Sequence, residues 1–176
     1  MISTFSICSL SLKLVEFPNN KILELLSWIR SEEDKQLWSG NTFQNGLNAD
    51  IFSIHMQRKE VYSHCYLGEK NSLIAYGEIV FADDEKGILC RVIVNPELRK
   101  LGIGKKFIRE LSNWAFKKKS LQKIILNTFG HNHPARKCYQ SLGFKEVSFK
   151  KNFRKVKNKW RDLVVMEKNV QVIENL

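Results

Sequence analysis

The stretch Arg99-Lys100-Leu101-Gly102-Ile103-Gly104 joins an apolar, strand-like run to a segment with helical periodicity. Glycines at such a junction permit positive φ angles and allow a ligand to approach the backbone closely. The unpaired amides at the start of a helix, together with the helix dipole, favour an anion at the same point. The stretch therefore predicts a phosphate-binding turn. An ordinary strand-to-helix loop is the alternative that the Gly-x-Gly spacing alone leaves open.

A second motif follows further along the chain, Asn132-His133-Pro134-Ala135-Arg136-Lys137-Cys138-Tyr139-Gln140-Ser141-Leu142-Gly143-Phe144. Together the two stretches resemble the GNAT superfamily of acyl-CoA N-acyltransferases, whose motifs are Arg/Gln-x-x-Gly-x-Gly/Ala and Asn-x-x-Ala-x-x-x-Tyr-x-x-x-Gly-Phe. The segment from Trp160 to Met166 is similar to the closing strand of the branch that contains ribosomal-protein alanine and spermidine acetyltransferases. The residues that match the two motifs are Arg99, Gly102, Gly104, Asn132, Ala135, Tyr139, Gly143 and Phe144.

The resemblance implies a single N-acetyltransferase domain over residues 1–176, with a mixed α/β (α+β) fold and a mainly antiparallel central sheet flanked by helices. It implies an enzyme that uses acetyl-CoA as co-substrate and transfers the acetyl group to a primary amine by direct attack. An acyl donor other than acetyl-CoA and the identity of the amine stay open. The residues that the resemblance assigns to acetyl-CoA are Val92, Ile93 and Val94 through their backbone, Arg99, Lys100, Leu101, Gly102, Ile103, Gly104 and Lys105 at the phosphates, and Asn132 and Ala135 in the second motif.

Two residues are predicted to carry the chemistry. The resemblance implies that Tyr139 lies close to the thioester sulfur, where its phenol can donate a proton to the departing thiolate. A tyrosine that merely packs in the core is the alternative. Glu78 lies in the middle of a predicted strand, an unusual place for a carboxylate, and is predicted to be the general base; a solvent-facing strand residue is the alternative.

The acceptor side is predicted from a shorter resemblance. The stretch from Trp38 to Phe43 is similar to an acceptor-side loop of some family members, so these two aromatic residues are predicted to contact the substrate. A tryptophan that anchors the loop to the core explains the same pattern. His131 and His133 flank Asn132, where one of them could relay a proton. The four histidines show no metal-ligand spacing, so the sequence predicts no metal site.

Apolar periodicity, caps and turn residues predict the secondary structure. A meander of three antiparallel strands is expected before the glycine turn, and a closing hairpin at the C-terminal end encloses a run of basic residues. Predicted helices cover residues 22–29, 31–38, 49–59, 103–119 and 135–142, and predicted strands cover residues 10–14, 61–67, 72–81, 87–94, 123–129, 144–150 and 160–167.

The net charge of +11 is concentrated in the second half of the chain. Up to Cys90 there are 8 basic and 12 acidic residues, and from Arg91 onward there are 21 and 6. Part of this charge suits a polyanionic cofactor, but the basic run from Lys150 to Lys159 exceeds that need. A solvated hairpin is one interpretation. The other is a surface for an acidic peptide, RNA or the ribosome, on a scaffold whose catalysis is lost or secondary.

The cysteines and the absence of long apolar runs predict the compartment. Cys8, Cys65, Cys90 and Cys138 are scattered and form no Cys-x-x-Cys pair, so they are expected to be buried free thiols in a reducing environment. No stretch approaches the roughly 18 apolar residues of a membrane span. A cytoplasmic protein without membrane contact, either a monomer or a homodimer, is the expectation.

Overall fold

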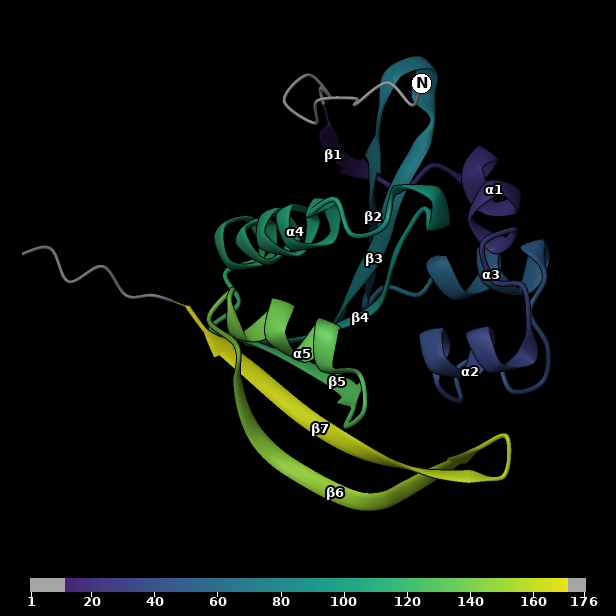
Figure 1. The fold of residues 1–176 in the computed structure, drawn as a ribbon. Coiled ribbons are helices and arrows are strands. Elements are labelled where there is room, and N and C mark those ends of the chain that lie inside the picture. Colours follow the sequence, from purple (N-terminus) through teal and green to yellow (C-terminus); the bar gives the residue numbers. More distant parts are fainter. Residues whose placement is uncertain (1–11, 171–176) are drawn as a thin grey trace, which may run out of the picture.

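A mixed sheet of seven strands, in the order β1-β2-β3-β4-β5-β7-β6, organises the computed structural model, which describes residues 12–170 (Figure 1). Only β4 and β5 run parallel, and every other neighbouring pair is antiparallel. The predicted mainly antiparallel class and the three-stranded meander are therefore confirmed. The strands are β1 (Lys13–Glu16), β2 (Val61–Leu67), β3 (Leu73–Phe81), β4 (Lys86–Val94), β5 (Lys123–Phe129), β6 (Lys145–Val156) and β7 (Lys159–Asn169).

The helices cover both faces of the meander (Figure 1). Alternate strand residues point to opposite faces, so Tyr66 packs in the cluster beneath α4 while Cys65 packs in the cluster beneath the first three helices. Helix α4 places Phe107 and Leu111 in the first cluster, as its apolar periodicity predicts. The helices are α1 (Ile22–Leu26), α2 (Glu32–Ser39), α3 (Ala49–Met56), α4 (Ile103–Lys119) and α5 (His133–Gln140).

Several element boundaries differ from the prediction. The first strand begins at Lys13, and predicted strand positions 10 and 11 lie outside the described residues, as do Cys8 and residues 171–176 of the tail. Helix α1 ends at Leu26 and α3 at Met56, three residues before their predicted ends. Beyond these ends the amides of Trp28, Ile29 and Arg58 donate to the carbonyl three residues back, so each helix closes in a tight turn.

The largest difference lies in the C-terminal hairpin. The basic run was predicted as a loop between two short strands, whereas β6 continues through it to Val156 and β7 starts at Lys159. The turn needs only Lys157 and Asn158, both at positive φ (46° and 60°). Lysine and arginine side chains do not interrupt a strand, because the ladder uses only backbone groups.

Strands β4 and β5 diverge along their length. Their pairing runs only from Lys86 opposite Lys123 to Leu89 opposite Leu126, so both strands continue beyond the last pair. On its other side β4 contains a bulge, because Arg91 and Val92 lie opposite the single residue Gly77 of β3. A Cβ on Gly77 would lie 2.8 Å from Phe107 Cε1, so only glycine fits there. The bulge and the divergence open a wedge between β4 and β5.

Within residues 12–170, no helix is long and apolar enough to cross a membrane. The same residues contain no group of three or more His, Cys, Asp or Glu side chains that could hold a metal ion. Cys65 is a buried free thiol, as predicted, whereas Cys90 and Cys138 are free but only half-buried.

Candidate functional site

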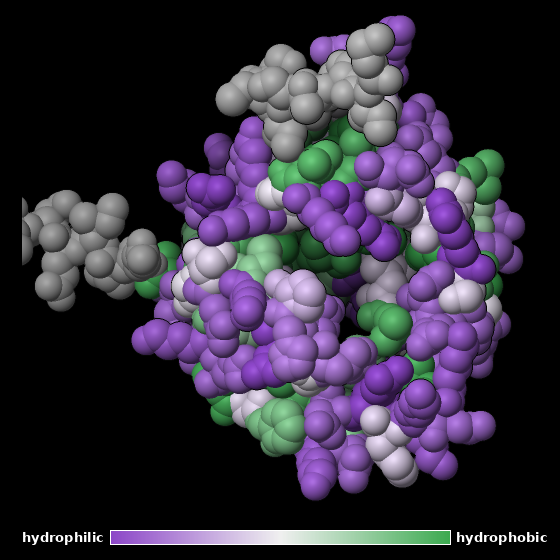
Figure 2. Space-filling model, in the orientation of Figure 1, coloured by the Kyte–Doolittle hydropathy of each residue, from purple (hydrophilic) through white to green (hydrophobic). Residues whose placement is uncertain are grey.

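A cavity of about 790 Å³ occupies the wedge between β4 and β5. Figure 2 shows a hollow near the centre of this face, between the positions of α5 and α2 in Figure 1. Its walls come from segments that are far apart in the sequence. The lining residues are residues 36–42 of α2 and the following loop, Arg58, Val80, residues 88–92 of β4, residues 127–129 of β5, His131, Asn132, Tyr139, and Phe153, Arg154 and Leu163 of the C-terminal hairpin.

Tyr139 reaches this cavity from α5. Its ring is half-buried and packs edge-to-face on Phe144, with the centroids 5.8 Å apart. Burial, with smaller contributions from Cys138 and Cys90, raises the pKa of Tyr139 to about 12. The phenol is therefore protonated at neutral pH, and it can act as a proton donor but not as a base.

Asn132 precedes α5 and caps it. Its side-chain oxygen accepts a hydrogen bond from the amide of Ala135 at 3.4 Å. The helix-capping interpretation of the motif asparagine is therefore realised in the structure. Asn132 also lines the cavity, so the cap places it next to Tyr139 on the same wall.

The glycine turn has the features expected of a phosphate site. Gly102 precedes α4 with a φ of 76°, and a Cβ added there would meet no atom within 4 Å. Among the side chains that the structure describes, none caps α4, whereas Ser31, Asn48 and Asn132 cap α2, α3 and α5. The amides of the first turn of α4 are thus left open to a ligand. The neighbouring side chains of Arg99, Lys100 and Lys105 are exposed, so their positive charge is available at the turn.

The backbone of β4 divides the three predicted pantetheine contacts into two groups. The amide of Asn95 donates to Ile74 O of β3 at 2.9 Å. Because backbone groups alternate sides along a strand, Ile93 also faces β3, where it pairs with Tyr76. Val92 and Val94 consequently face the diverging side. The geometry suits these two residues for ligand contact and does not suit Ile93.

Glu78 lies in a buried ionic network on β3 and does not line the cavity. Its carboxylate accepts hydrogen bonds from Arg91 Nη2 at 2.5 Å and from the Tyr76 hydroxyl at 2.6 Å, and His55 Nε2 lies at 3.0 Å. Burial alone would raise the pKa of Glu78. The His55 hydrogen bond and the Arg91 charge outweigh burial and lower it to about 2. This environment disfavours the predicted general-base role, because the carboxylate is both enclosed and hard to protonate.

The two predicted acceptor-side aromatics have different positions. Trp38 lines the cavity, and its indole Nε1 donates to Arg91 O at 2.7 Å, which anchors α2 to the bulge of β4. Phe43 is 3% exposed and packs against Phe52, with ring centroids 5.8 Å apart. Phe43 is a core residue that supports the cavity from behind, because its ring is enclosed by other aromatics and does not line the wall.

The basic run is not one uniform surface. Lys150, Lys151 and Lys155 are exposed, whereas Val156 is fully buried. Arg154 is half-buried and lines the cavity. At the tip of the hairpin, Lys157 Nζ lies 2.7 Å from Glu33 Oε2 of α2, so the hairpin end is tied to the opposite wall of the cavity.

Two residues of the site, Arg91 and Arg154, have no individual role in the sequence analysis, and a third, His131, appears there only as one of two histidines that could relay a proton. Arg91 was not predicted because its role depends on a bulge, which leaves no local signal. Arg154 was treated only as one member of a charge run. His131 lines the cavity, and burial together with the Arg161 charge lowers its pKa below the ordinary histidine value. In the sequence, the position of His131 next to the motif residue Asn132 indicates that it could lie at the site.

Known proteins match the chain in sequence and in structure. Residues 21–144 match the family model described as Acetyltransferase (GNAT) family. An N-acetyltransferase 9-like protein of Caenorhabditis briggsae is 28% identical over 91 residues, which is 51% of this chain and 46% of that protein. The alignment thus spans about half the length of this curated relative.

Solved structures show the same fold. The spermidine N-acetyltransferase of Vibrio cholerae, in complex with CoA and spermine, superposes with a TM-score of 0.78 at 15% identity, over 90% of this chain and 95% of that one. A structure of the Vibrio cholerae spermidine/spermine N-acetyltransferase with manganese ions gives a TM-score of 0.71 at 15% identity, over 90% and 92%. The family match covers the glycine turn, the diverging β4 and the Tyr139 motif. The chain therefore belongs to the acetyltransferase (GNAT) family.

Proposed function

We propose that the protein transfers the acetyl group of acetyl-CoA to a primary amine by direct attack of the amine on the thioester carbonyl. The observation that carries this proposal is the position of Tyr139, a protonated phenol in the same cavity as the open side of β4. Acetyl-CoA supplies the activated acyl group and a thiolate leaving group. The chain itself has to orient the thioester, accept a proton from the amine and donate one to the sulfur.

Each of these tasks has a candidate in the structure. The amides of Val92 and Val94, which face the diverging side of β4, bind the pantetheine arm and the thioester oxygen. The first turn of α4 and Gly102 hold the phosphates. Tyr139 donates its proton to the sulfur as the carbon–sulfur bond breaks. Trp38 forms the acceptor-side wall, and the cap formed by Asn132 and Ala135 positions the helix that carries Tyr139.

His131 replaces Glu78 as the proposed proton acceptor. It lines the cavity together with Tyr139, and its lowered pKa keeps the imidazole neutral at physiological pH. A neutral imidazole can take the amine's proton directly or through one water molecule. Glu78 is proposed instead to position Arg91 and, through Arg91, the bulge that opens β4.

The proton acceptor is tested by His131→Gln. We expect kcat/KM at neutral pH to fall by about tenfold or more, and the deficit to shrink at high pH where the amine is already deprotonated. The pH profile of acetylation separates this role from simple packing. The matched control is His133→Gln, because His133 is exposed like His131 but does not line the cavity. A deficit that is equal at every pH would contradict the proton-accepting role.

The phosphate site is tested by Gly102→Ala against Gly143→Ala. Both glycines have positive φ (76° and 89°) and room for a methyl group, so both variants carry a similar backbone cost. Only the new methyl at position 102 enters the space next to the first turn of α4. We expect Gly102→Ala to weaken CoA binding by about tenfold or more, as measured by calorimetry and by the CoA-induced shift in melting temperature. Equal CoA affinities of the two variants would contradict the proposed phosphate site.

Other parts of the assignment stay predictions. These are the single domain over residues 1–176, the cytoplasmic location, the choice between monomer and homodimer, and the contact of the basic run with acidic peptide, RNA or ribosome. The rival class, a binding module without catalysis, requires that no amine be acetylated while nucleic acid binds with strong salt dependence whether or not CoA is present.

A further inference from the structure

We propose that the amine acceptor carries a carboxylate and that Arg154 binds it. This inference rests on the proposed acetyltransferase function and specifies the substrate class of the same cavity. It predicts an acceptor unlike spermine, which is bound in the Vibrio cholerae structure of the same fold. Some of the charges that face the cavity are already neutralised within the protein, and one is not.

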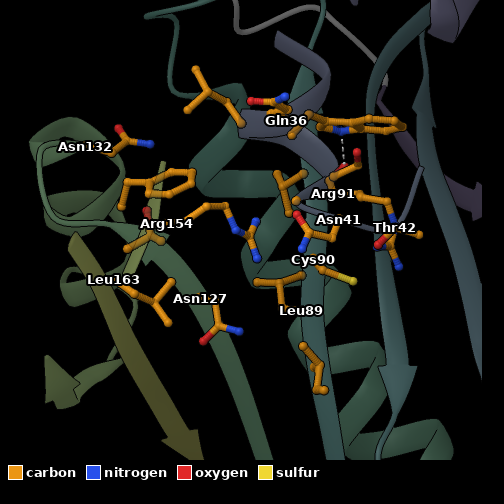
Figure 3. A pocket seen from close by; sticks show the side chains of 18 of the residues that line it. Gln36, Asn41, Thr42, Leu89, Cys90, Arg91, Asn127, Asn132, Arg154 and Leu163 are labelled. Carbon is orange, nitrogen blue, oxygen red and sulfur yellow. Dashed lines mark hydrogen bonds between the residues drawn. The ribbon is translucent and has the colours of Figure 1, made fainter. Parts of the chain in front are cut away.

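Arg154 projects from β6 into the cavity. Figure 3 shows its guanidinium pointing inward from the hairpin toward the side of β4 and the loop after α2. It lies directly against the backbone of Gly40, because a Cβ on that glycine would be 2.8 Å from Arg154 Nη1. Among residues 12–170, no carboxylate lies within 4.0 Å of this guanidinium. Arg154 therefore presents an unpaired, half-buried positive charge to the cavity.

The other two arginines of the wall already have partners. Arg91 forms its ion pair with the fully buried Glu78 and also donates to the Thr42 hydroxyl at 3.1 Å. Arg58 is paired with Glu60 at the surface. Arg154 is thus the arginine of the cavity wall that is left to bind a ligand.

The described cavity wall contains no aspartate or glutamate. A polyamine would bring several positive charges into a site with an unpaired arginine and no carboxylate to compensate them, which costs free energy. A carboxylate on the acceptor is attracted by the Arg154 guanidinium, whereas the ammonium groups of a polyamine are repelled by it. The planar guanidinium matches a carboxylate with two parallel hydrogen bonds, which fixes orientation as well as charge.

The same positive charge favours the chemistry of the reacting amine. A neighbouring cation disfavours the ammonium form and so lowers the amine's pKa. More of the bound acceptor is then in the neutral, nucleophilic form that attack on a thioester requires. The carboxylate binds Arg154 while the amine reaches toward Tyr139, because both residues line one continuous cavity.

The experiment compares acceptors of opposite charge. The probes are a peptide with an alanine N-terminus followed by two glutamates, its counterpart with two lysines, free glutamate, and spermidine. For each probe, kcat/KM is measured by thiol release at saturating acetyl-CoA, and CoA affinity is measured separately by calorimetry. The variants are Arg154→Glu and the milder Arg154→Gln. The matched control is Lys151→Glu, which changes the net charge by the same amount at an exposed position of the same strand.

We expect the wild-type protein to prefer the glutamate peptide over the lysine peptide by about tenfold or more, a difference of about 1.4 kcal/mol. Arg154→Gln should lose most of this preference, and Arg154→Glu should reverse it, while Lys151→Glu retains it. Unchanged CoA affinity in all variants would assign the effect to the acceptor. Efficient use of free glutamate would indicate an amino-acid acceptor, and use of the peptide alone would indicate an acidic N-terminus.

Three results would overturn the inference. One is a wild-type preference for spermidine or the lysine peptide. A second is a decrease in kcat/KM that is equal for all acceptors in the Arg154 variants. A third is a loss of CoA affinity in the same variants, because this would show that Arg154 binds the cofactor. By contrast, CoA binding without acetylation of any probe would contradict the proposed function itself.

Discussion

Tyr139→Phe is expected to lower kcat by about a hundredfold or more while leaving CoA affinity nearly unchanged. The substitution keeps the ring that packs on Phe144 and removes only the hydroxyl. Without that hydroxyl, the sulfur of CoA has to leave as an unprotonated thiolate or take its proton from water. Because burial raises the pKa of Tyr139 to about 12, the wild-type phenol stays protonated across the working range. The alkaline limb of its pH profile should therefore appear only near that value.

The effect is measured under conditions where chemistry limits the rate, for example as a single turnover with enzyme-bound acetyl-CoA. The matched control is Tyr62→Phe, which removes a hydroxyl from a ring that packs on Phe81 away from the cavity. Both variants should melt at nearly the wild-type temperature. Full single-turnover activity in the Tyr139 variant would show that the phenol does not donate the proton.

Glu78→Gln is expected to destabilise the protein by about 3–5 kcal/mol. The amide cannot neutralise Arg91, so a buried guanidinium would lose its counter-charge and the Tyr76 hydroxyl and His55 would lose a charged acceptor. The change in the free energy of unfolding is measured by urea denaturation, with tryptophan fluorescence as the signal. Glu60→Gln removes the acid from the exposed Arg58 pair and should barely change the midpoint.

The same carboxylate makes stability depend on pH in a defined window. The pKa of Glu78 falls from its ordinary 4.5 to about 2 in the folded protein. Because the pKa of Glu78 is lower in the folded protein, the unfolded chain takes up the proton at a higher pH than the folded protein does. The stabilisation from the ionised carboxylate is therefore complete at pH values above the ordinary pKa. It is lost progressively between about pH 4.5 and pH 2. Glu78→Gln should remove this part of the acid sensitivity, and an unchanged acid profile in the variant would contradict the ionic role of Glu78.

Activity should also respond to Glu78→Gln, but through geometry. Arg91 O receives the indole hydrogen bond of Trp38, and the bulge at Arg91 holds β4 away from β5. A loosened Arg91 would disturb both the acceptor wall and the amides of Val92 and Val94. A variant that folds with weakened CoA binding would fit a positioning residue, whereas a general base would show a changed pH–rate profile with normal CoA affinity.

Local sequence patterns were sufficient for most elements. Helix α4 carries an apolar stripe, a glycine start and three terminal lysines, and all of these signals act within one element. The meander from β2 to β4 follows from β-branched and aromatic runs separated by short turns. Tyr139 and Gly102 were found because their roles depend on motifs whose spacing is read directly along the chain.

The class of fold, the family motifs and the glycine turn could be predicted from the sequence, because each depends on residues that are near neighbours in the chain. The burial of Glu78 against Arg91, the position of Phe43 in the core and the position of Arg154 in the cavity wall could not be predicted in this way. These outcomes depend on contacts between residues far apart in sequence. Whether a carboxylate serves as a base or as a counter-ion is set by the charges and the solvent around it, and those exist only once the strands have paired.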